Sequence, residues 1–258
     1  MYDAFFGFKQ SPFNMSPDPA FLYNQDLRPQ TSATLKAGIK GSWTKKNQVL
    51  FFKALHFDAS FFTTSIDNEI VQYEIYGDNY YRNASKTNRL GFAVHGKLEV
   101  YRDLVFSIAY TYSHYIYKSY TAKSLETDST GTLVQVTRDF SGNAEPNVPR
   151  NNLNLSLSYK HPMGKKIGIF ARLSYLGISG VWVDDANSAK TDSYNLVNTL
   201  LGLNMKFGHF VFTLSGGVNN IFNRVYAGDS NLNSADKRFY DAGSPRDFTG
   251  AVNFGYSF

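Results

Sequence analysis

Apolar and polar residues alternate along several stretches of this sequence. Between 152 and 159, a leucine or tyrosine at every odd position alternates with asparagine or serine, and the same period of two recurs in 104–113 and 247–258. Successive side chains of a β-strand point to opposite faces. The pattern therefore predicts strands with one apolar and one polar face.

Extending this search along the chain predicts ten strands. They span roughly 2–8, 32–42, 53–66, 88–100, 104–117, 150–160, 166–178, 193–206, 209–222 and 246–258. The connections 9–31, 67–87, 118–149, 179–192 and 223–245 are long, and those between them are short. Outer-membrane barrels combine short periplasmic turns with longer extracellular loops, and their tilted strands need roughly 9–11 residues to cross the hydrocarbon. We therefore predict an all-β fold, an antiparallel transmembrane β-barrel portion, rather than a soluble sandwich with a hydrolytic site.

The phase of each predicted strand indicates which side chains face lipid and which face the lumen. The residues expected to face lipid are Phe106, Ile108, Leu153, Leu155, Leu157, Val252 and Phe254. The residues expected to face the lumen are Ser107, Thr111, Asn154, Ser156 and Asn253, and His56 and His95 share that phase.

Composition agrees with an all-β membrane chain. The 22 Phe, 18 Tyr and 2 Trp make up 16% of the residues, and those near strand ends predict aromatic girdles at the membrane interfaces. No apolar run approaches the roughly 18 residues of a membrane-spanning helix. The absence of cysteine excludes disulfides and cysteine-based zinc sites. The net charge is +5, but the sequence has no long run of basic residues of the kind that binds nucleic acid.

Several motifs resemble those of the TonB-dependent receptor family. Residues 218–226, VNNIFNRVY, are similar to the family motif V-N-N-L-F-D-x-x-Y, and residues 147–150 have the family's NVPR. Residues 26–31, DLRPQT, are similar to the family motif N-L-x-P-E-x-S. Residues 81–84, YRNA, followed by 88–92, NRLGF, are similar to the family's Y-x-N-A followed by G-x-E. Gln30 and Ala93 stand where the family has glutamate, so the chain departs from the family pattern at these two positions. The motifs follow the family order across nearly the whole chain.

The resemblance implies that residues 1–258 are the C-terminal part of a receptor barrel. The family has an N-terminal plug domain, a TonB-contacting segment and a barrel of about 22 strands. We expect about ten strands of that larger barrel here, with the plug domain absent. The first residues, MYDAFF, lack the basic region and long apolar core of a secretory signal, which fits either a mature bacterial outer-membrane protein or a fragment of one.

The implied function is transport rather than catalysis. The chain resembles an outer-membrane receptor segment for TonB-dependent uptake of a scarce nutrient, of the ferric siderophore, cobalamin or oligosaccharide class. The alternative is a passive ten-stranded porin-like or adhesin-like barrel. Expected partners are outer-membrane lipid and lipopolysaccharide, the barrel assembly machinery, a small-molecule or chelate ligand and, only through the missing N-terminal part, the TonB complex. We expect no cofactor and no nucleic-acid partner.

Residues that contact a ligand are expected in the long loops, where arginine and aromatic side chains suit an anionic, ring-bearing chelate. The candidates are Tyr120, Arg138, Trp182, Asp184, Arg238, Phe239 and Tyr240. The end of the sequence resembles the signal that the assembly machinery reads, with alternating aromatics at Phe254, Tyr256 and Phe258.

The sequence contains no set of residues with catalytic spacing, so we predict no catalytic site. Oxygen-bearing residues alternate at Asp229, Asn231, Asn233 and Asp236, as in calcium loops. The glycine and the closing glutamate of such a loop are missing, so we predict no metal site.

Overall fold

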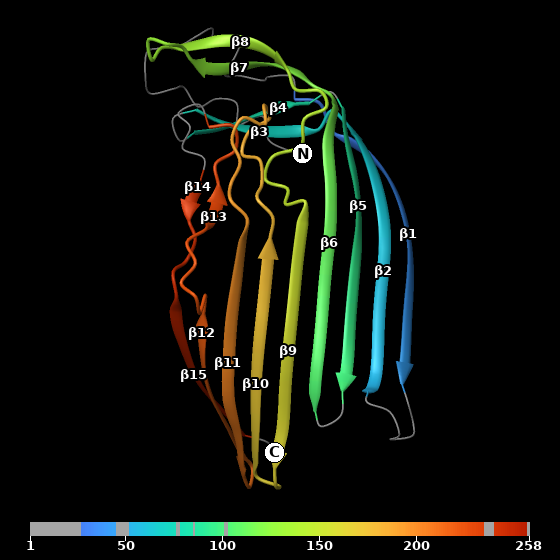
Figure 1. Ribbon diagram of the computed structural model, residues 1–258, viewed down its shortest axis with the longest axis vertical. Helices are drawn as coiled ribbons and strands as arrows, with labels where there is room; N and C mark the ends of the chain where they lie inside the picture. Colours follow the sequence, from blue (N-terminus) through green and yellow to red (C-terminus); the bar gives the residue numbers. More distant parts are fainter. Residues whose placement is uncertain are drawn as a thin grey trace.

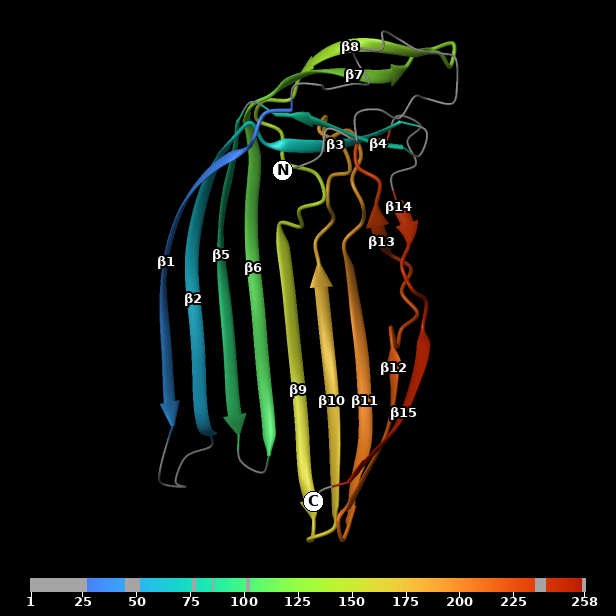
Figure 2. The same cartoon turned by 180° about the vertical axis from the view of Figure 1, so that it is seen from behind.

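The computed structural model describes residues 27–44, 52–75, 78–84, 86–100, 103–234 and 240–256. Within these ranges every regular element is a β-strand. Figures 1 and 2 show the long strands side by side in one curved sheet, with the short strands gathered at one end. None of the described residues belongs to a helix that is long and apolar enough to cross a membrane.

Nine long strands form one antiparallel sheet in the order β1-β2-β5-β6-β9-β10-β11-β12-β15. The strands are β1 (Thr31–Thr44), β2 (Phe52–Asp67), β5 (Lys86–Val100), β6 (Leu104–Ser119), β9 (Asn151–Met163), β10 (Ile167–Ile178), β11 (Tyr194–Phe207), β12 (Phe210–Asn219) and β15 (Asp247–Tyr256). They confirm nine of the predicted strands and the all-β antiparallel fold. The tenth predicted strand, 2–8, lies outside the described residues. β1 and β15 are therefore the two edges of the described sheet.

The strands reverse direction through short turns at the end opposite the short strands. Phe207 of β11 pairs with Phe210 of β12, so only Gly208 and His209 connect them. Gly208 has a φ of +58°, a conformation that glycine adopts without steric cost. Asp103 lies in the left-handed region at the turn into β6, which aspartate tolerates better than most residues.

The predicted strand 209–222 is too long at its C-terminal end, because β12 stops at Asn219. Asn220 follows with a φ of 48° and closes a turn with its own side chain. Its Oδ1 accepts a hydrogen bond from the Arg224 backbone N–H at 2.8 Å, and its Nδ2 donates to the Arg224 carbonyl at 2.8 Å. These local bonds replace the ladder bonds that would have continued the strand.

Three of the long connections contain hairpins of their own. They are β3 (Ile70–Ile75) with β4 (Asp78–Asn83), β7 (Thr121–Thr127) with β8 (Leu133–Asp139), and β13 (Ala227–Ser230) with β14 (Tyr240–Ala242). The alternation pattern predicts plain connections here. These strands have only three to seven residues, which is too short for a clear period of two.

The strand register places apolar and polar residues in alternate rows across the wall. One row consists of Leu55, Leu98, Phe106, Leu157 and Leu173, on five neighbouring strands. The next row consists of His56, Lys97, Ser107, Ser156 and Ser174. Val252 and Phe254 lie opposite Leu214 and Phe212, and Asn253 lies opposite Thr213. The two predicted sets of residues therefore occupy opposite faces, as expected.

An arginine on each face tests this assignment. We expect Leu157→Arg to destabilise the protein by about 2–4 kcal/mol in a lipid bilayer, because the charge would face hydrocarbon near the middle of β9. Ser156→Arg should change the stability by less than about 1 kcal/mol, because its side chain joins the polar row. Denaturant unfolding in phospholipid vesicles measures both. Equal losses for the two variants would contradict the assignment.

Candidate functional site

Most of the buried side chains among the described residues belong to the hairpins, the long loops and the strand ends next to them. Figures 1 and 2 show that these hairpins and loops meet at one end of the sheet. Tyr117, Tyr120, Phe140 and Ala84 form a small apolar cluster there. Tyr117 and Arg89 have the same strand phase as Ser107 and belong to the polar face. The loops therefore close over the polar face of the sheet. We call this end the rim.

Asp185 is the centre of a hydrogen-bond network at the rim. It is 1% exposed, and its Oδ1 accepts a hydrogen bond from the Tyr117 hydroxyl at 2.6 Å. Its Oδ2 accepts from the Tyr120 hydroxyl at 3.1 Å and from the Arg82 guanidinium at 3.3 Å. Burial, and next the Asp185 charge, raise the pKa of Tyr120, so its hydroxyl stays protonated and donates. A buried carboxylate is retained because three donors satisfy it.

Arg82 connects this network to the hairpins. Its Nε donates to the Tyr120 hydroxyl at 2.6 Å, and its guanidinium lies 5.5 Å from the centre of the Tyr120 ring. A further N–H donates to the Lys123 carbonyl at the start of β7. One arginine on β4 therefore fixes the position of the β7–β8 hairpin relative to the β3–β4 hairpin.

Asn233 joins two further loops to the same centre. Its Oδ1 accepts a hydrogen bond from the Asp185 backbone N–H at 2.7 Å, and its Nδ2 donates to the Gln72 carbonyl at 2.8 Å. Its own N–H donates to the Val183 carbonyl at 2.9 Å. The φ of 54° at this residue is one that asparagine tolerates. The side chain of one of the oxygen-bearing residues considered for calcium is thus engaged in loop contacts.

A second charged cluster consists of Glu69, Arg89 and Glu145. Arg89 on β5 donates to a carboxylate oxygen of Glu145 from Nε at 3.1 Å, and it forms an ion pair with Glu69. Both glutamates are only 6% exposed. Burial, followed by the charge of Glu69, raises the pKa of Glu145 to about 7, while Arg89 opposes the shift.

A cavity of about 840 Å³ lies between the two clusters. Its polar lining includes Glu69, Arg89, Glu145, Asp185 and Tyr117, and its apolar lining includes Ile70, Val71, Pro146, Val148 and Leu232. We call it the rim chamber. It combines a hydrophobic wall with a few convergent polar groups, which is typical of small-molecule sites.

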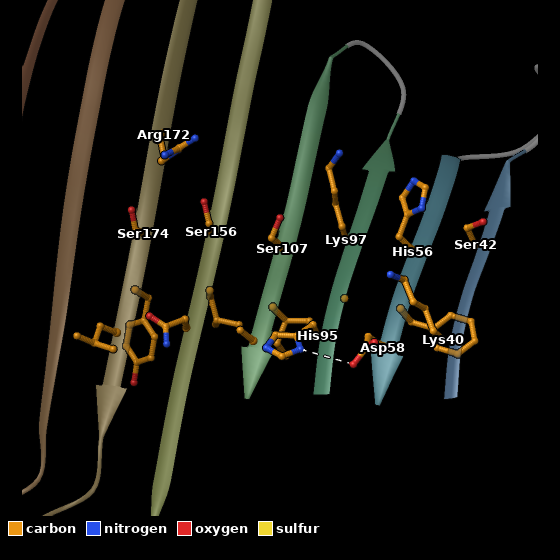
Figure 3. A pocket seen from close by; sticks show the side chains of 18 of the residues that line it. Lys40, Ser42, His56, Asp58, His95, Lys97, Ser107, Ser156, Arg172 and Ser174 are labelled. Carbon is orange, nitrogen blue, oxygen red and sulfur yellow. Dashed lines mark ion pairs between the residues drawn. The ribbon is translucent and has the colours of Figure 1, made fainter. Parts of the chain in front are cut away.

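A second hollow, of about 790 Å³, lies along the polar face of the sheet, and we call it the wall hollow. Figure 3 shows its charged and titratable side chains, which are Lys40, His56, Asp58, His95, Lys97 and Arg172. Asp58 and His95 approach each other at 3.9 Å. Positive charge prevails in this hollow, so it favours an anionic group.

The predicted ligand residues occupy different environments. Tyr120 is fully buried beside Asp185, and Asp184 is buried and accepts hydrogen bonds from Ser188. Trp182 is half-buried, with the Lys190 ammonium 5.1 Å from its ring centre. Arg138 on β8 and Tyr240 at the start of β14 are exposed. Tyr120 lies against the loop that carries Trp182 and Asp184.

The other predicted positions are at or beyond the edges of the described ranges. Arg238 and Phe239 lie outside the described residues. Phe254 and Tyr256 lie on β15 with exposed side chains, and Phe258 is outside the described part. These assignments remain predictions.

Sequence reasoning missed most of the residues that build the rim. They are Glu69, Arg82, Arg89 and Glu145, which come from distant parts of the chain. Asn233 was considered only as a calcium ligand, whereas its side chain connects loops. No local spacing connects them. The one usable signal was the polar-face phase of Arg89, because an arginine in a barrel lumen needs a carboxylate partner.

The fold and the rim together define one wall of a membrane β-barrel with loops that close over its lumen side. Residues 1–221 match the sequence model of a family described as TonB dependent receptor-like, beta-barrel. That match covers most of the chain, so the chain belongs to this family of outer-membrane receptors. The protein is located in the outer membrane of Gram-negative bacteria.

Solved structures show the same fold. The siderophore receptor PiuA from Acinetobacter baumannii is 21% identical over 86% of this chain and 28% of its own, with a TM-score of 0.57. The ferric preacinetobactin receptor BauA from the same species is 13% identical over 87% and 29%, with a TM-score of 0.60. The ferric yersiniabactin receptor FyuA from Yersinia pestis is 16% identical over 86% and 29%, with a TM-score of 0.57. This chain thus spans less than a third of each of those chains.

The raised pKa of Glu145 predicts a pH-dependent rim. Between about pH 4.5 and 7 the unfolded chain has released this proton while the folded rim retains it. The folded rim therefore loses stability as pH rises through this window, by at most about 1.4 kcal/mol per pH unit. We expect Glu145→Gln to remove this decline in stability. Asp192→Asn should preserve it, because this control removes the charge of an exposed carboxylate in another loop.

Amide hydrogen exchange at Glu145 and Asn147, whose N–H groups donate to Tyr115 and Trp182, measures the effect. Protection factors corrected for intrinsic exchange should fall between pH 5 and 7.5 in the wild type and in Asp192→Asn. The same fall in Glu145→Gln would contradict the prediction.

Proposed function

We propose that this chain forms part of the wall and the extracellular rim of a receptor for energy-coupled uptake of a ferric chelate. The observation that carries the proposal is the rim chamber, which several loops build over the polar face of the sheet. The three solved receptors described above are named for a siderophore, for ferric preacinetobactin and for ferric yersiniabactin, which supports a ferric chelate over cobalamin or an oligosaccharide.

The proposed path of the chelate runs from the exposed loops to the lumen wall. Arg138 and Tyr240 are exposed and suited to first contact with an anionic chelate. Trp182 lies deeper in its loop, and Tyr120 and Asp184 act from within by holding the loops in place. The wall hollow, shown in Figure 3, would attract the chelate through its positive charge after the chelate passes the rim.

The remaining parts of the receptor are also proposed. Unpaired backbone groups at the edges of β1 and β15 would cost several kcal/mol each in lipid, so we propose that further strands of the full receptor pair with them. A plug domain outside these residues would contact TonB. Outer-membrane lipid and lipopolysaccharide would surround the apolar face.

The alternative is a passive ten-stranded barrel, in which the segment 2–8 pairs with β15. That segment lies outside the described residues. The difference between the two functions is energy coupling, which is directly measurable.

Uptake of iron-55 chelates by cells that produce the complete receptor tests the proposal. We expect uptake of at least one catecholate, hydroxamate or citrate complex, abolished by deletion of TonB. Combined Arg138→Ala and Tyr240→Ala substitutions should weaken its binding about tenfold, through loss of charge-assisted and aromatic contacts. Asp192→Asn should bind normally. Uptake that persists without TonB would support the passive barrel.

We also propose that the terminal aromatics Phe254, Tyr256 and Phe258 are read by the barrel assembly machinery. Deletion of Phe258 should lower the amount of receptor in the outer membrane several-fold, while receptor that has already inserted unfolds at an unchanged denaturant concentration. Quantitative immunoblotting of membrane fractions measures the first effect. Equal abundance with and without Phe258 would remove the basis for treating this end as a signal.

A further inference from the structure

One carboxylate oxygen in the rim chamber is buried and has no hydrogen-bond partner among the described residues. Glu69 is 94% buried, and its Oε1 is paired with Arg89. Its Oε2 has no hydrogen-bond partner within the described part of the chain. Glu69 also lines the chamber. A buried carboxylate oxygen without a donor is costly, so this atom is positioned to accept a hydrogen bond from a ligand.

The charges around the chamber do not balance. Three carboxylates line it, those of Glu69, Glu145 and Asp185, and Arg89 is the cationic side chain among the described lining residues. Asp185 is compensated by Arg82 and two tyrosine hydroxyls. Arg89 alone faces both glutamates. With all groups ionised, the Glu69, Arg89 and Glu145 cluster carries one excess negative charge.

The lining selects an organic cation over a metal ion. No group of acids and histidines among the described residues has the arrangement to hold a metal. Beside Glu69 and Glu145 lie Ile70, Val71 and Val148, which offer apolar surface rather than further oxygen ligands. A cationic head on a short apolar stem uses both features, because the head meets the carboxylates and the stem meets the wall.

We propose that the rim chamber is a subsite for a protonated amine or guanidinium group on an apolar stem, with Glu69 Oε2 as its principal acceptor and Glu145 as the second carboxylate. The chamber would select chelates that bear such a group. That last step rests on the proposed uptake function, whereas binding of the cation itself does not.

The protonation of Glu145 provides an independent signature. Its pKa of about 7 is set by burial, Glu69, Arg89 and Asp185, and these groups with Tyr117 are the titratable or charged groups that face it. Glu145 gains its charge as pH rises from 6 to 8. Cation binding in the chamber therefore tightens several-fold over this range.

The binding test uses the complete receptor, folded in detergent micelles, with butylguanidinium as the probe and butylurea as its uncharged isostere. Isothermal titration calorimetry should show saturable binding of butylguanidinium, at least tenfold tighter than that of butylurea. Glu69→Gln should lose this tenfold preference, and Glu69→Asp should keep part of it. Asp192→Asn, which removes an equal charge outside the chamber, should bind like the wild type.

Folding is checked by the mobility difference between heated and unheated samples in SDS gels. If Glu69→Gln does not fold, Glu69→Asp and the pH dependence of the wild type decide the outcome. The proposal is overturned if butylguanidinium binds no more tightly than butylurea, if folded Glu69→Gln binds normally, or if binding does not tighten between pH 6 and 8.

A second pair of probes separates this proposal from the uptake function. Cells that produce the complete receptor receive a linear ferric trihydroxamate with a free terminal ammonium group, or its N-acetylated form. Preferred uptake of the ammonium form supports both proposals. Butylguanidinium binding without TonB-dependent uptake of either chelate leaves the subsite standing and removes the chelate function. Equal uptake of both forms, without butylguanidinium binding, removes the subsite and leaves the uptake function.

Discussion

Backbone hydrogen bonding in the absence of water is the constraint on which this structure depends. Each N–H or C=O left unpaired in hydrocarbon costs several kcal/mol, and the ladders from β1 to β15 pair these groups strand by strand. A continuous ladder fixes the register, and the register sends Leu157 to one face and Ser156 to the other. The wall is a single sheet, so it has no buried core of its own. Its chemistry is limited to a face of alternate residues and to the rim, where the ladder ends.

The rim is stabilised differently, because its backbone is not hydrogen-bonded into the nine-stranded sheet. Its loops carry polar groups that the sheet does not pair, so side chains replace the ladder. Asp185, Asn233 and Arg82 together connect β6, the β3–β4 hairpin, the β7–β8 hairpin and the segments around 183 and 233. Removing one partner of a buried charged pair typically costs about 3–5 kcal/mol. The loops therefore hold one another in place as a unit, which makes a chamber with fixed walls.

The wall could be predicted from the sequence because its determinants are local and repeat every two residues. Leu153, Leu155 and Leu157 alone specify the faces of β9, and neighbouring strands repeat the pattern. The end of β12 was missed because the Asn220 turn depends on side-chain bonds to Arg224 that no periodicity contains. The rim clusters were missed for a related reason: Arg82 and Asp185 are 103 positions apart, and only the completed sheet brings them together. Tyr120 was correctly placed in a loop, but its hydroxyl faces Asp185 rather than solvent.

The two hollows of the polar face carry opposite charge, and this separation has a consequence for any ligand that enters. The wall hollow is lined by Lys40, Lys97 and Arg172, whereas the rim chamber has more carboxylate than guanidinium. A ligand with an anionic chelate group and a cationic tail would be turned so that the chelate faces the wall and the tail faces the rim. Coulomb interactions in such partly buried sites are several-fold stronger than in water, so the orientation would persist at physiological ionic strength. The strongest control on that orientation is Glu145, because its protonation removes the excess negative charge of the chamber without any change in the wall.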